Sequence, residues 1–510
     1  MTTLTYDALV IGAGNGGLAA ALRLAKSNKK VLLVERHLLG GGFATSFIRG
    51  RFEFEASLHE LCDFGHEDLH GNLYELFKDF DVLKDIEFVD VPEAFRVISL
   101  STKEDYTLPF GIENFINKME EYVPGSKKSV TTFFKLGAEI QEALKYLNLS
   151  RGQPDTKVMM EKYPNFMRTA TYSTDKVLKA IKMPKKAQEI LGTYWSYLGA
   201  PTAHLGFTHY CIMVYLYISL KAQIPTTRSH GISQALEDAI RKHGGEIFYG
   251  DEVVKILTEN GVVSGAVLAS GTIIKTKHIV SNAMPVSVYG KMVDKKDVPL
   301  WQVKKANFNK LAGRGFSIFL GLNKTPQELG LKDYSYFIYD YLDSNKQFET
   351  MKNISNHGQV VVVLNNALPN CSPKGTTIMY FTSLYFGDCF EKALTKENYF
   401  DLKDRLAKQF IETFEKATNT NIHDYIEEIE VGTPLTYAHY TDAPDGTIYG
   451  YLTEDLDNMM ARLTTMYAEE DLKGLRFCGG HAVRSSGYNS SYLSGDLAAK
   501  LTLGDMKEDK

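Results

Sequence analysis

A glycine-rich turn near the start of the chain has the spacing that holds the phosphates of a dinucleotide. Gly12, Gly14 and Gly17 form the pattern G-x-G-x-x-G. The first glycine permits a tight turn, the second lets a pyrophosphate approach the backbone, and the third lets a helix pack closely on a strand. Further along, Glu35 offers a carboxylate that can accept from a ribose hydroxyl and that would repel a 2′-phosphate. The pattern therefore predicts a dinucleotide site that disfavours NADP.

The residues around these glycines have the pattern strand, turn, helix, strand. Ala8–Ile11 and Val31–Val34 are short apolar runs typical of strands buried on both faces. Between them, Leu18–Ser27 has alanine and leucine at helical spacing. A turn at this place puts the pyrophosphate on the N-terminus of the helix, where free N–H groups and the helix dipole favour negative charge. A chance glycine turn would not explain the strands, the helix and the acid together.

Three further segments extend the predicted site. A run that contains Gly41 and Gly42 gives an open backbone surface beside the far end of an extended dinucleotide. The strand at Val253–Val254 has a backbone amide with which an adenine can pair. The segments Leu475–His481 and Ser485–Gly495 have the pattern of a buried strand, a polar loop and a helix, whose N–H groups point at an anionic or carbonyl-bearing ligand. The predicted cofactor-binding residues are Gly12, Gly14, Asn15, Gly16, Gly17, Glu35, Arg36, Gly41, Gly42, Phe43, Thr45, Val254, Asn282, Gly479, Gly480, His481, Tyr488, Asn489 and Ser490.

The length of 510 residues predicts two domains. Helical periodicity dominates 111–222, strand patterns dominate 314–381, and a helix is predicted over Gly231–His243. The predicted fold class is α/β, with a Rossmann-like cofactor domain interleaved with a substrate domain made of a mixed sheet and helices. The predicted boundaries are 1–105, 226–295 and 431–510 for the cofactor domain, and 106–225 and 296–430 for the substrate domain.

Composition excludes several classes of protein. The net charge of −5 argues against a general nucleic-acid binder. The five scattered cysteines predict neither a disulfide framework nor a metal site. Met1–Asp7 lacks the pattern of a signal peptide, which indicates a cytoplasmic setting. The apolar run Tyr210–Ile218 is less than half of the roughly 20 residues that span a bilayer, so only contact with a membrane surface stays open.

Further motifs are distributed over the whole chain. They include the strand that leads to His59, the helix from Gly231, the segment Val280–Ala283, the pair Gly432–Pro434 and Asp445–Gly450, and the loop Cys478–Gly480. On these motifs and the fingerprint, the chain resembles nearly end to end the phytoene desaturases, carotenoid cis–trans isomerases and retinol saturases of the amine-oxidase-like superfamily. The Gly-Thr-Pro and Asp-Gly-Thr pair is most similar to the isomerase and saturase branch. The resemblance implies FAD as the cofactor.

The sequence departs from the family pattern at two positions near the cofactor. The family usually has Gly-Asp in the C-terminal loop, with the acid bonded to the ribityl chain of the flavin, whereas Gly480 and His481 follow Gly479 here. The early glycine loop usually continues with Arg or Ser, whereas Phe43 follows Gly42 here. The residues that hold the flavin are therefore expected to differ from those of the family.

The resemblance implies that the flavin ring faces a long apolar tunnel. The 28 Phe, 29 Tyr and 15 Met residues supply suitable surface, although most of them are expected to be ordinary core. His59 is predicted as a catalytic residue that donates or accepts a proton, with a bond to loop backbone as the alternative. Glu55 is expected on the same strand face, where it orients His59 or bonds the FAD. Tyr488 is the second predicted catalytic residue. The predicted substrate contacts are Arg228, Tyr437 and His439.

The leading hypothesis is an enzyme that reduces, desaturates or isomerises carbon–carbon double bonds in a carotenoid, a retinoid or an unsaturated fatty acid. The sequence has no second fingerprint for NAD. Amine or amino-acid oxidation on the same scaffold is one alternative. A carrier without flavin, related to Rab GDP-dissociation inhibitors, is another, because Gly480 replaces the usual acid. The expected partner is a long hydrophobic small molecule and no nucleic acid, while peripheral membrane contact and a homo-oligomer stay open.

Overall fold

A five-stranded parallel sheet forms the core of the part that carries the glycine fingerprint. The computed structural model describes residues 2–66, 69–150, 153–453, 462, 472–481 and 487–508. In spatial order the strands are β12 (Glu246–Tyr249), β3 (Val31–Glu35), β2 (Ala8–Ile11), β16 (Ile279–Ser281) and β22 (Leu475–Phe477). Every pairing in this sheet is parallel, as two buried apolar runs predict.

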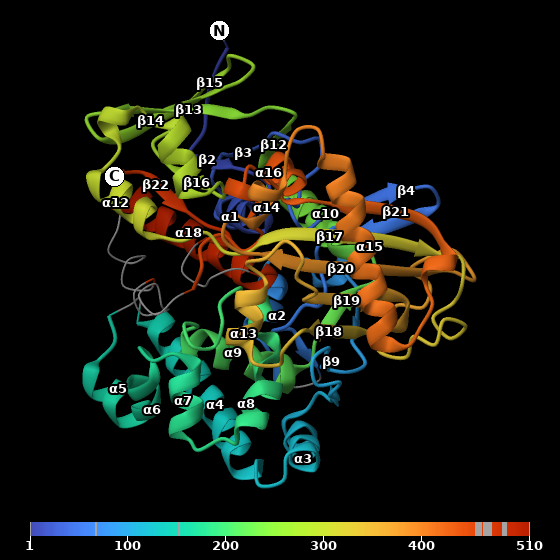
Figure 1. Ribbon diagram of the computed structural model, residues 1–510. Helices are drawn as coiled ribbons and strands as arrows, with labels where there is room; N and C mark the ends of the chain where they lie inside the picture. Colours follow the sequence, from blue (N-terminus) through green and yellow to red (C-terminus); the bar gives the residue numbers. More distant parts are fainter. Residues whose placement is uncertain are drawn as a thin grey trace.

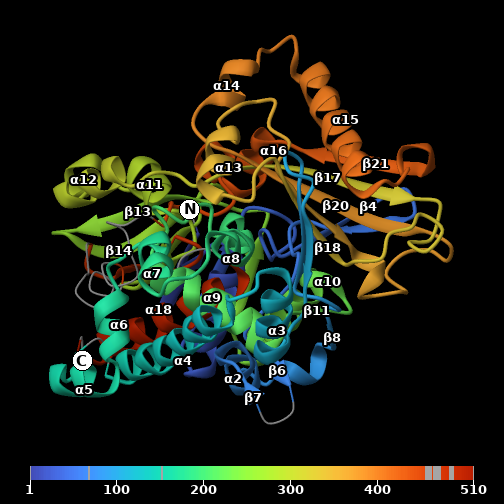
Figure 2. The ribbon, with the colours of Figure 1, turned by 60° about the horizontal axis from the view of Figure 1, so that its bottom comes forward.

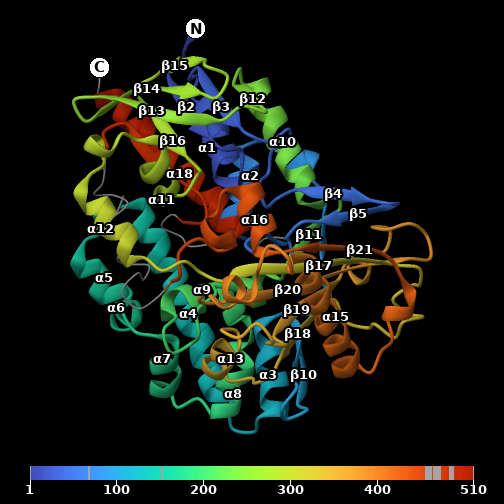
Figure 3. The ribbon, with the colours of Figure 1, turned by 45° about the horizontal axis from the view of Figure 1, so that its top comes forward.

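The side chains of these strands alternate between two packing layers. Val10 and Leu33 pack with helices α1 (Asn15–Lys26), α10 (Arg228–Lys242) and α18 (Tyr488–Glu508). Leu9 and Leu32 point the other way, because successive strand residues face opposite sides. They pack against a four-stranded sheet, which lies beside β2 and β3 in Figure 3. In spatial order its strands are β1 (Thr3–Thr5), β15 (Ile273–Lys275), β14 (Val262–Leu268) and β13 (Val253–Glu259).

The five-stranded sheet gathers strands from three separate parts of the chain. Strands β2 and β3 come from its start, β12 and β16 from its middle and β22 from its end. Figure 1 shows the blue helix α1 and the red helix α18 side by side. The chain between these parts builds a seven-stranded sheet and a layer of helices. This interleaving confirms the predicted α/β fold class.

The seven-stranded sheet contains both parallel and antiparallel strand pairs. In order its strands are β10 (Asp105–Leu108), β9 (Phe95–Ser99), β18 (Ser335–Tyr339), β19 (Gln359–Val363), β20 (Thr377–Tyr385), β17 (Arg314–Leu322) and β21 (Ile426–Gly432). Only β9 and β18 pair in parallel among these strands. Ile318 and Phe381 pack against α15 (Tyr399–Thr418) on one face. Phe319 and Tyr380 face the other way.

A layer of helices covers that other face (Figure 2). Its members are α3 (Ile112–Tyr122), α4 (Lys127–Leu149), α5 (Thr156–Lys162), α6 (Pro164–Thr169), α7 (Thr174–Ala180), α8 (Lys185–Leu191) and α9 (Phe207–Leu220). Helix α9 contains the apolar run Tyr210–Ile218 and is largely buried in this layer, as expected of a helix that is apolar on all sides. None of the described helices has the length and apolar character that crossing a bilayer requires.

Shorter elements connect the two parts and correct two predictions. They are β4 (Ser46–Arg49), β5 (Phe52–Glu55), β6 (Gly65–His66), β7 (Leu69–His70), β8 (Phe88–Asp90), β11 (Gln223–Pro225), α2 (Asn72–Asp79), α11 (Pro285–Ser287), α12 (Leu300–Phe308), α13 (Ser344–Thr350), α14 (Cys389–Ala393) and α16 (Pro434–Thr441). The strand predicted to reach His59 ends at Glu55, where its pairing with β4 ends. The helix predicted from Gly231 begins at Arg228.

Replacing Gly495 by alanine is expected to destabilise the protein. Helices α1 and α18 cross so closely that a Cβ at Gly495 would overlap the carbonyl oxygen of Gly16. Overpacking of this kind costs about 1–3 kcal/mol and should lower the thermal midpoint measured by calorimetry. Gly504 lies in the same helix, and no atom lies within 4 Å of the position that an added methyl group would take there, so Gly504→Ala should add up to about 1 kcal/mol of stability. Equal midpoints for the two variants would contradict the close crossing.

Candidate functional site

A cavity of about 670 Å³ extends from the glycine fingerprint to helix α9. Its volume falls within the range of roughly 300–1,000 Å³ that is usual for small-molecule sites. The lining combines Gly12 and Gly14 of the parallel sheet, Ser317 and Thr382 of the mixed sheet, and Met213 of α9. The cavity is therefore built by both parts of the molecule.

The fingerprint end of the cavity has the features of a phosphate cradle. Helix α1 begins directly after Gly14, and no side chain caps its first turn. A Cβ at Gly14 would lie 2.5 Å from Nδ2 of Asn282, which packs over the turn. Asn15 Oδ1 is buried without a hydrogen-bond partner among the described residues. Free N–H groups at the start of α1 and glycine backbone in the cavity lining fit a dinucleotide pyrophosphate, whose oxygens accept hydrogen bonds.

Glu35 lies at the end of β3 and lines the same end of the cavity. Its Oε2 accepts from the Ala13 N–H at 2.7 Å, and its Oε1 accepts from the His37 N–H at 2.9 Å. Each carboxylate oxygen can accept a further hydrogen bond. Glu35 therefore holds the fingerprint turn in place and can still receive a ribose hydroxyl. Its neighbour Arg36 also lines the cavity.

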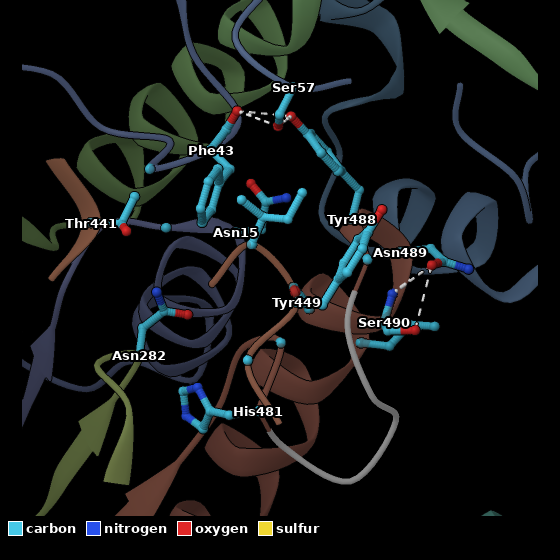
Figure 4. Close-up of a pocket in the computed structure, with 18 of the residues that line it drawn as sticks. Asn15, Phe43, Ser57, Asn282, Thr441, Tyr449, His481, Tyr488, Asn489 and Ser490 are labelled. Atoms are coloured by element: carbon cyan, nitrogen blue, oxygen red, sulfur yellow. Dashed lines mark hydrogen bonds between the residues drawn. The ribbon is translucent and has the colours of Figure 1, made fainter. Parts of the chain in front are cut away.

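The C-terminal segment reaches the cavity through Gly480 and His481. The Gly479 N–H donates to Ser494 Oγ at 2.8 Å, which ties this segment to α18. Figure 4 shows His481 beside Asn282 in the cavity wall. Desolvation, with smaller effects of nearby Arg462 and Lys305, lowers the pKa of His481 to about 3. The imidazole that follows Gly480 is therefore neutral.

Tyr488 closes the cavity near its middle. Its hydroxyl donates to the Phe43 carbonyl at 2.8 Å and lies 2.9 Å from Ser57 Oγ (Figure 4). Next to it, Asn489 Oδ1 accepts from the Ser490 N–H at 2.7 Å. All five residues line the cavity. Ser485 and Ser486 of the predicted closing loop lie outside the described residues.

A chain of hydroxyl groups leads to His59. Tyr437 OH donates to Ser317 Oγ at 2.7 Å, Ser317 Oγ lies 3.5 Å from Thr382 Oγ1, and Thr382 Oγ1 lies 3.1 Å from His59 Nε2. The four side chains line the cavity. Desolvation lowers the pKa of His59 to about 4, so the ring is neutral at physiological pH. His59 can accept a proton or relay one, but it is not a ready cationic acid.

Glu55 does not have the role expected of it. Its buried carboxylate accepts from the Ser229 N–H at 2.8 Å and from the Ser229 hydroxyl. Because β5 ends at Glu55, His59 is not on the same strand face. Glu55 is also absent from the cavity lining. It fixes the start of α10 and does not orient His59.

The other predicted residues fall into two groups. Gly41 and Gly42 line the cavity with the residues above. Seven predicted residues lie outside the lining: Gly16, Gly17, Thr45, Val254, Gly479, Arg228 and His439. Near Val254, the adjacent Val253 lines the cavity instead.

Three of these seven have a structural contact that accounts for their position. A Cβ at Gly17 would overlap the Gly12 carbonyl, as expected of the glycine that packs helix on strand. Arg228 is buried at the start of α10 and donates to the Cys371 carbonyl. The backbone carbonyl of His439 accepts from Arg36 at 2.5 Å.

Several polar residues of the cavity were not predicted from the sequence. Ser317 and Thr382 lie on strands whose apolar pattern conceals them. His209 lies in apolar α9, and neither ring nitrogen has a hydrogen-bond partner among the described residues. Glu60 directly follows His59. An acid adjacent to the predicted catalytic histidine is the one signal that would have revealed it.

Comparison with known proteins places these features in a context. A model of an NAD(P)-binding Rossmann-like domain matches residues 10–80. An all-trans-retinol 13,14-reductase of Danio rerio is 25% identical, over 98% of this chain and 85% of its own. A chloroplastic prolycopene isomerase 1 of an Oncidium hybrid cultivar is 24% identical, over 99% of this chain and 85% of its own. The resemblance predicted from the sequence is confirmed. It covers both the dinucleotide-binding part and the part that carries α9.

Solved structures share the fold. An oxidoreductase from Methanosarcina mazei superimposes with a TM-score of 0.65 at 17% identity, covering 99% of this chain and 100% of that one. A putrescine oxidase bound to putrescine gives a TM-score of 0.63 at 13% identity, covering 98% and 100%. At these identities the likeness concerns the fold alone. It confirms the Rossmann-like and mixed-sheet architecture.

Glu55→Gln is expected to make the stability of the protein less dependent on pH. Desolvation raises the pKa of Glu55 to about 7, although the hydrogen bonds from Ser229 lower it in part. The folded protein therefore binds this proton more tightly than the unfolded chain does. The contribution of this group to stability is fully present below about pH 4.5, the ordinary pKa of a glutamate side chain, and is lost as the pH rises through about 7. Urea titrations at pH 5 and pH 8 should show a smaller difference for the variant than for the wild type. An unchanged difference would contradict the role of this carboxyl group.

Proposed function

We propose that the chain is an FAD-dependent oxidoreductase or isomerase that acts on carbon–carbon double bonds of a long apolar molecule. The observation that carries this proposal is the continuity of the cavity. The same cavity is lined by Gly14 in the phosphate cradle and by Ile212, Met213 and Leu216 of α9. A molecule at the apolar end thus shares one space with a dinucleotide bound at the other.

The dinucleotide end supports FAD by the chemistry of its residues. The turn at Gly12–Gly14 and Asn15 would hold the pyrophosphate, Glu35 a ribose, and His481 the ribityl region. FAD supplies a ring that exchanges hydrides or electrons with a substrate. The chain itself binds and orients the partners and keeps water away from them.

The apolar end supports a long hydrocarbon substrate. Residues from α9, including Tyr217, form one wall, and Tyr197 and Tyr449 add aromatic rings to the lining. Desolvation lowers the pKa values of the lining residues His59 and His209, so both are neutral at physiological pH. Such a lining favours burial of apolar surface. Retinol and prolycopene, which appear in the names of the relatives, are both extended polyenes.

Amine oxidation is a second candidate, because Glu60 lies beside aromatic rings. A bound ammonium ion would favour ionisation of this carboxyl group, as opposite charges do at close range. A carrier without flavin is less well supported, because the glycine turn retains its open backbone.

Spectroscopy with defined compounds separates these functions. The purified protein is expected to show flavin absorbance, and after anaerobic photoreduction all-trans-retinol or prolycopene should reoxidise the flavin or be isomerised. Incubation of the oxidised protein with putrescine in the presence of oxygen should form no hydrogen peroxide. Peroxide from putrescine, with both polyenes unchanged, would favour the amine oxidase. Protein without flavin absorbance, even after reconstitution with FAD, would favour the carrier.

Gly14→Ala is expected to weaken FAD binding. The added methyl group would lie 2.5 Å from Asn282 Nδ2, so Asn282 or the turn that lines the cavity must shift. We expect at least about tenfold weaker binding, since the loss of one charge-assisted hydrogen bond costs about 1.5–3 kcal/mol. Flavin fluorescence titration of the apoprotein measures this. Gly290→Ala is the control, because nothing lies within 4 Å of a Cβ there. Unchanged affinity of the Gly14 variant would exclude this turn as the cradle.

A further inference from the structure

Glu60 presents an orphaned acidic oxygen in a residue that lines the cavity. The residue is 5% exposed and contributes to the lining beside His59 and Tyr197. Its Oε1 accepts from Tyr197 OH at 3.0 Å. Its Oε2 is buried and has no hydrogen-bond partner among the described residues. One oxygen is thus held in place, and the other makes no hydrogen bond with the described residues.

The groups around Glu60 are phenols, a thiol and other acids. Tyr194 and Tyr197 belong to the 3₁₀ turn Gly192–Tyr197, and Tyr217 belongs to α9. His59, Cys62 and Asp63 belong to the same loop as Glu60. Two further groups come from other segments: Glu93 precedes β9, and Tyr334 precedes β18. Burial raises the pKa of Glu60 to about 8, and the negative charge of Glu93 adds to this, whereas hydrogen bonding to Tyr197 and, more weakly, to Tyr194 lowers it. The carboxyl group therefore keeps its proton at neutral pH, whereas the neighbouring histidine is unprotonated.

Aromatic rings beside Glu60 are suited to positive charge on a hydrocarbon. The rings of Tyr194 and Tyr197 stack with centroids 5.1 Å apart, and those of Tyr197 and Tyr217 lie 6.0 Å apart. Tyr197 and Tyr217 both line the cavity. The face of an aromatic ring attracts a cation. A positive charge that develops on a polyene at this place would be spread along the conjugated chain and stabilised by these faces.

We propose that Glu60 is the acid that protonates a carbon–carbon double bond of the substrate. This inference rests on the proposed function, and it names the group that performs the proton transfer. The O–H bond of Glu60 breaks, the π electron pair forms a new C–H bond, and Glu60 becomes a carboxylate beside a cationic carbon. Rotation about the former double bond and return of the proton to Glu60 give an isomer, with no oxidant or reductant consumed. A reduced flavin, if bound, would supply the hydride that saturation of the bond requires, and Glu60 would then regain its proton from solvent.

Glu60 fits this step better than the histidines of the cavity. Desolvation lowers the pKa of His59 to about 4 and that of His209 to about 3. Neither ring carries an available acidic proton at neutral pH. Proton donation is most effective when the pKa of the acid lies near the working pH.

Deuterium exchange tests the step directly. The flavin-loaded protein in deuterated buffer is incubated with all-trans-retinol or prolycopene, and mass spectrometry follows deuterium in the recovered polyene and its products. Glu60→Gln keeps the size of the side chain and removes the acid. We expect incorporation to fall by about 100-fold or more, the contribution usual for a general acid. Flavin absorbance and the thermal midpoint of the variant should match those of the wild type.

Glu93→Gln is the matched control. Burial raises the pKa of Glu93 to about 7, but its carboxylate accepts from backbone N–H groups, including that of Ser335 at 3.1 Å, and does not line the cavity. This variant should retain incorporation at pH 6, where Glu60 stays protonated. Equal incorporation by the Glu60 variant and the wild type would overturn the inference and leave the proposed function intact. Wild-type protein that leaves both polyenes unchanged and undeuterated would contradict the proposed function, and the role of Glu60 with it.

Infrared spectroscopy gives a readout that needs no substrate. The wild type should show carbonyl absorption of protonated carboxyl groups at pH 7, with one component that disappears as the pH rises through about 8 and others, from Glu55 and Glu93, that disappear through about 7. The component near pH 8 should be missing in Glu60→Gln and should titrate at lower pH in Glu93→Gln, because a neighbouring negative charge is removed. If the spectrum of Glu60→Gln at pH 7 has the same carboxyl absorption as that of the wild type, the inference is overturned whatever the substrate.

Discussion

Contact between the two ends of the chain determines the geometry of the whole molecule. The carbonyl of Gly16 lies against Gly495 of α18, and a Cβ at Gly16 would lie 2.7 Å from the backbone nitrogen of Gly479. The residues around the fingerprint turn therefore face a phosphate cradle on one side and support the C-terminal segment on the other. The mixed sheet and α9 belong to the chain between these ends. Their position relative to the cradle, and so the shape of the cavity, depends on this contact.

Three titratable groups in the lining of the cavity are uncharged near pH 7. His59 and His481 have lowered pKa values and Glu60 a raised one, each chiefly through desolvation. All three are consequently neutral near pH 7. Burying an unpaired charge is costly, so a lining of neutral donors and acceptors admits a hydrocarbon more readily than a charged lining would. The same desolvation that excludes charge keeps a proton on Glu60.

The sequence was most informative where local pattern and backbone geometry coincide. The apolar runs at Ala8–Ile11 and Val31–Val34 became strands because both faces of the sheet are covered. The fingerprint turn was predictable because its glycines stand where the backbone packs too closely for a side chain, as at Gly17 against the Gly12 carbonyl. Glu55 was misassigned, since a strand ends where its partner strand ends and the residue pattern does not record that. Ser317 and Thr382 could not be predicted as site residues, because only tertiary pairing places two hydroxyl groups of separate strands beside His59.

The order of the strands has a consequence for how the protein is made. Strand β22 covers β16, but the ribosome synthesises β22 only after the whole mixed sheet and α15. Until then the nascent chain has an open sheet edge, and such edges pair readily with other chains. The segment with Gly480 and His481 also follows the mixed sheet in the chain. A nascent chain therefore exposes that edge of the sheet, and its cavity lacks part of its wall, until these residues have been synthesised.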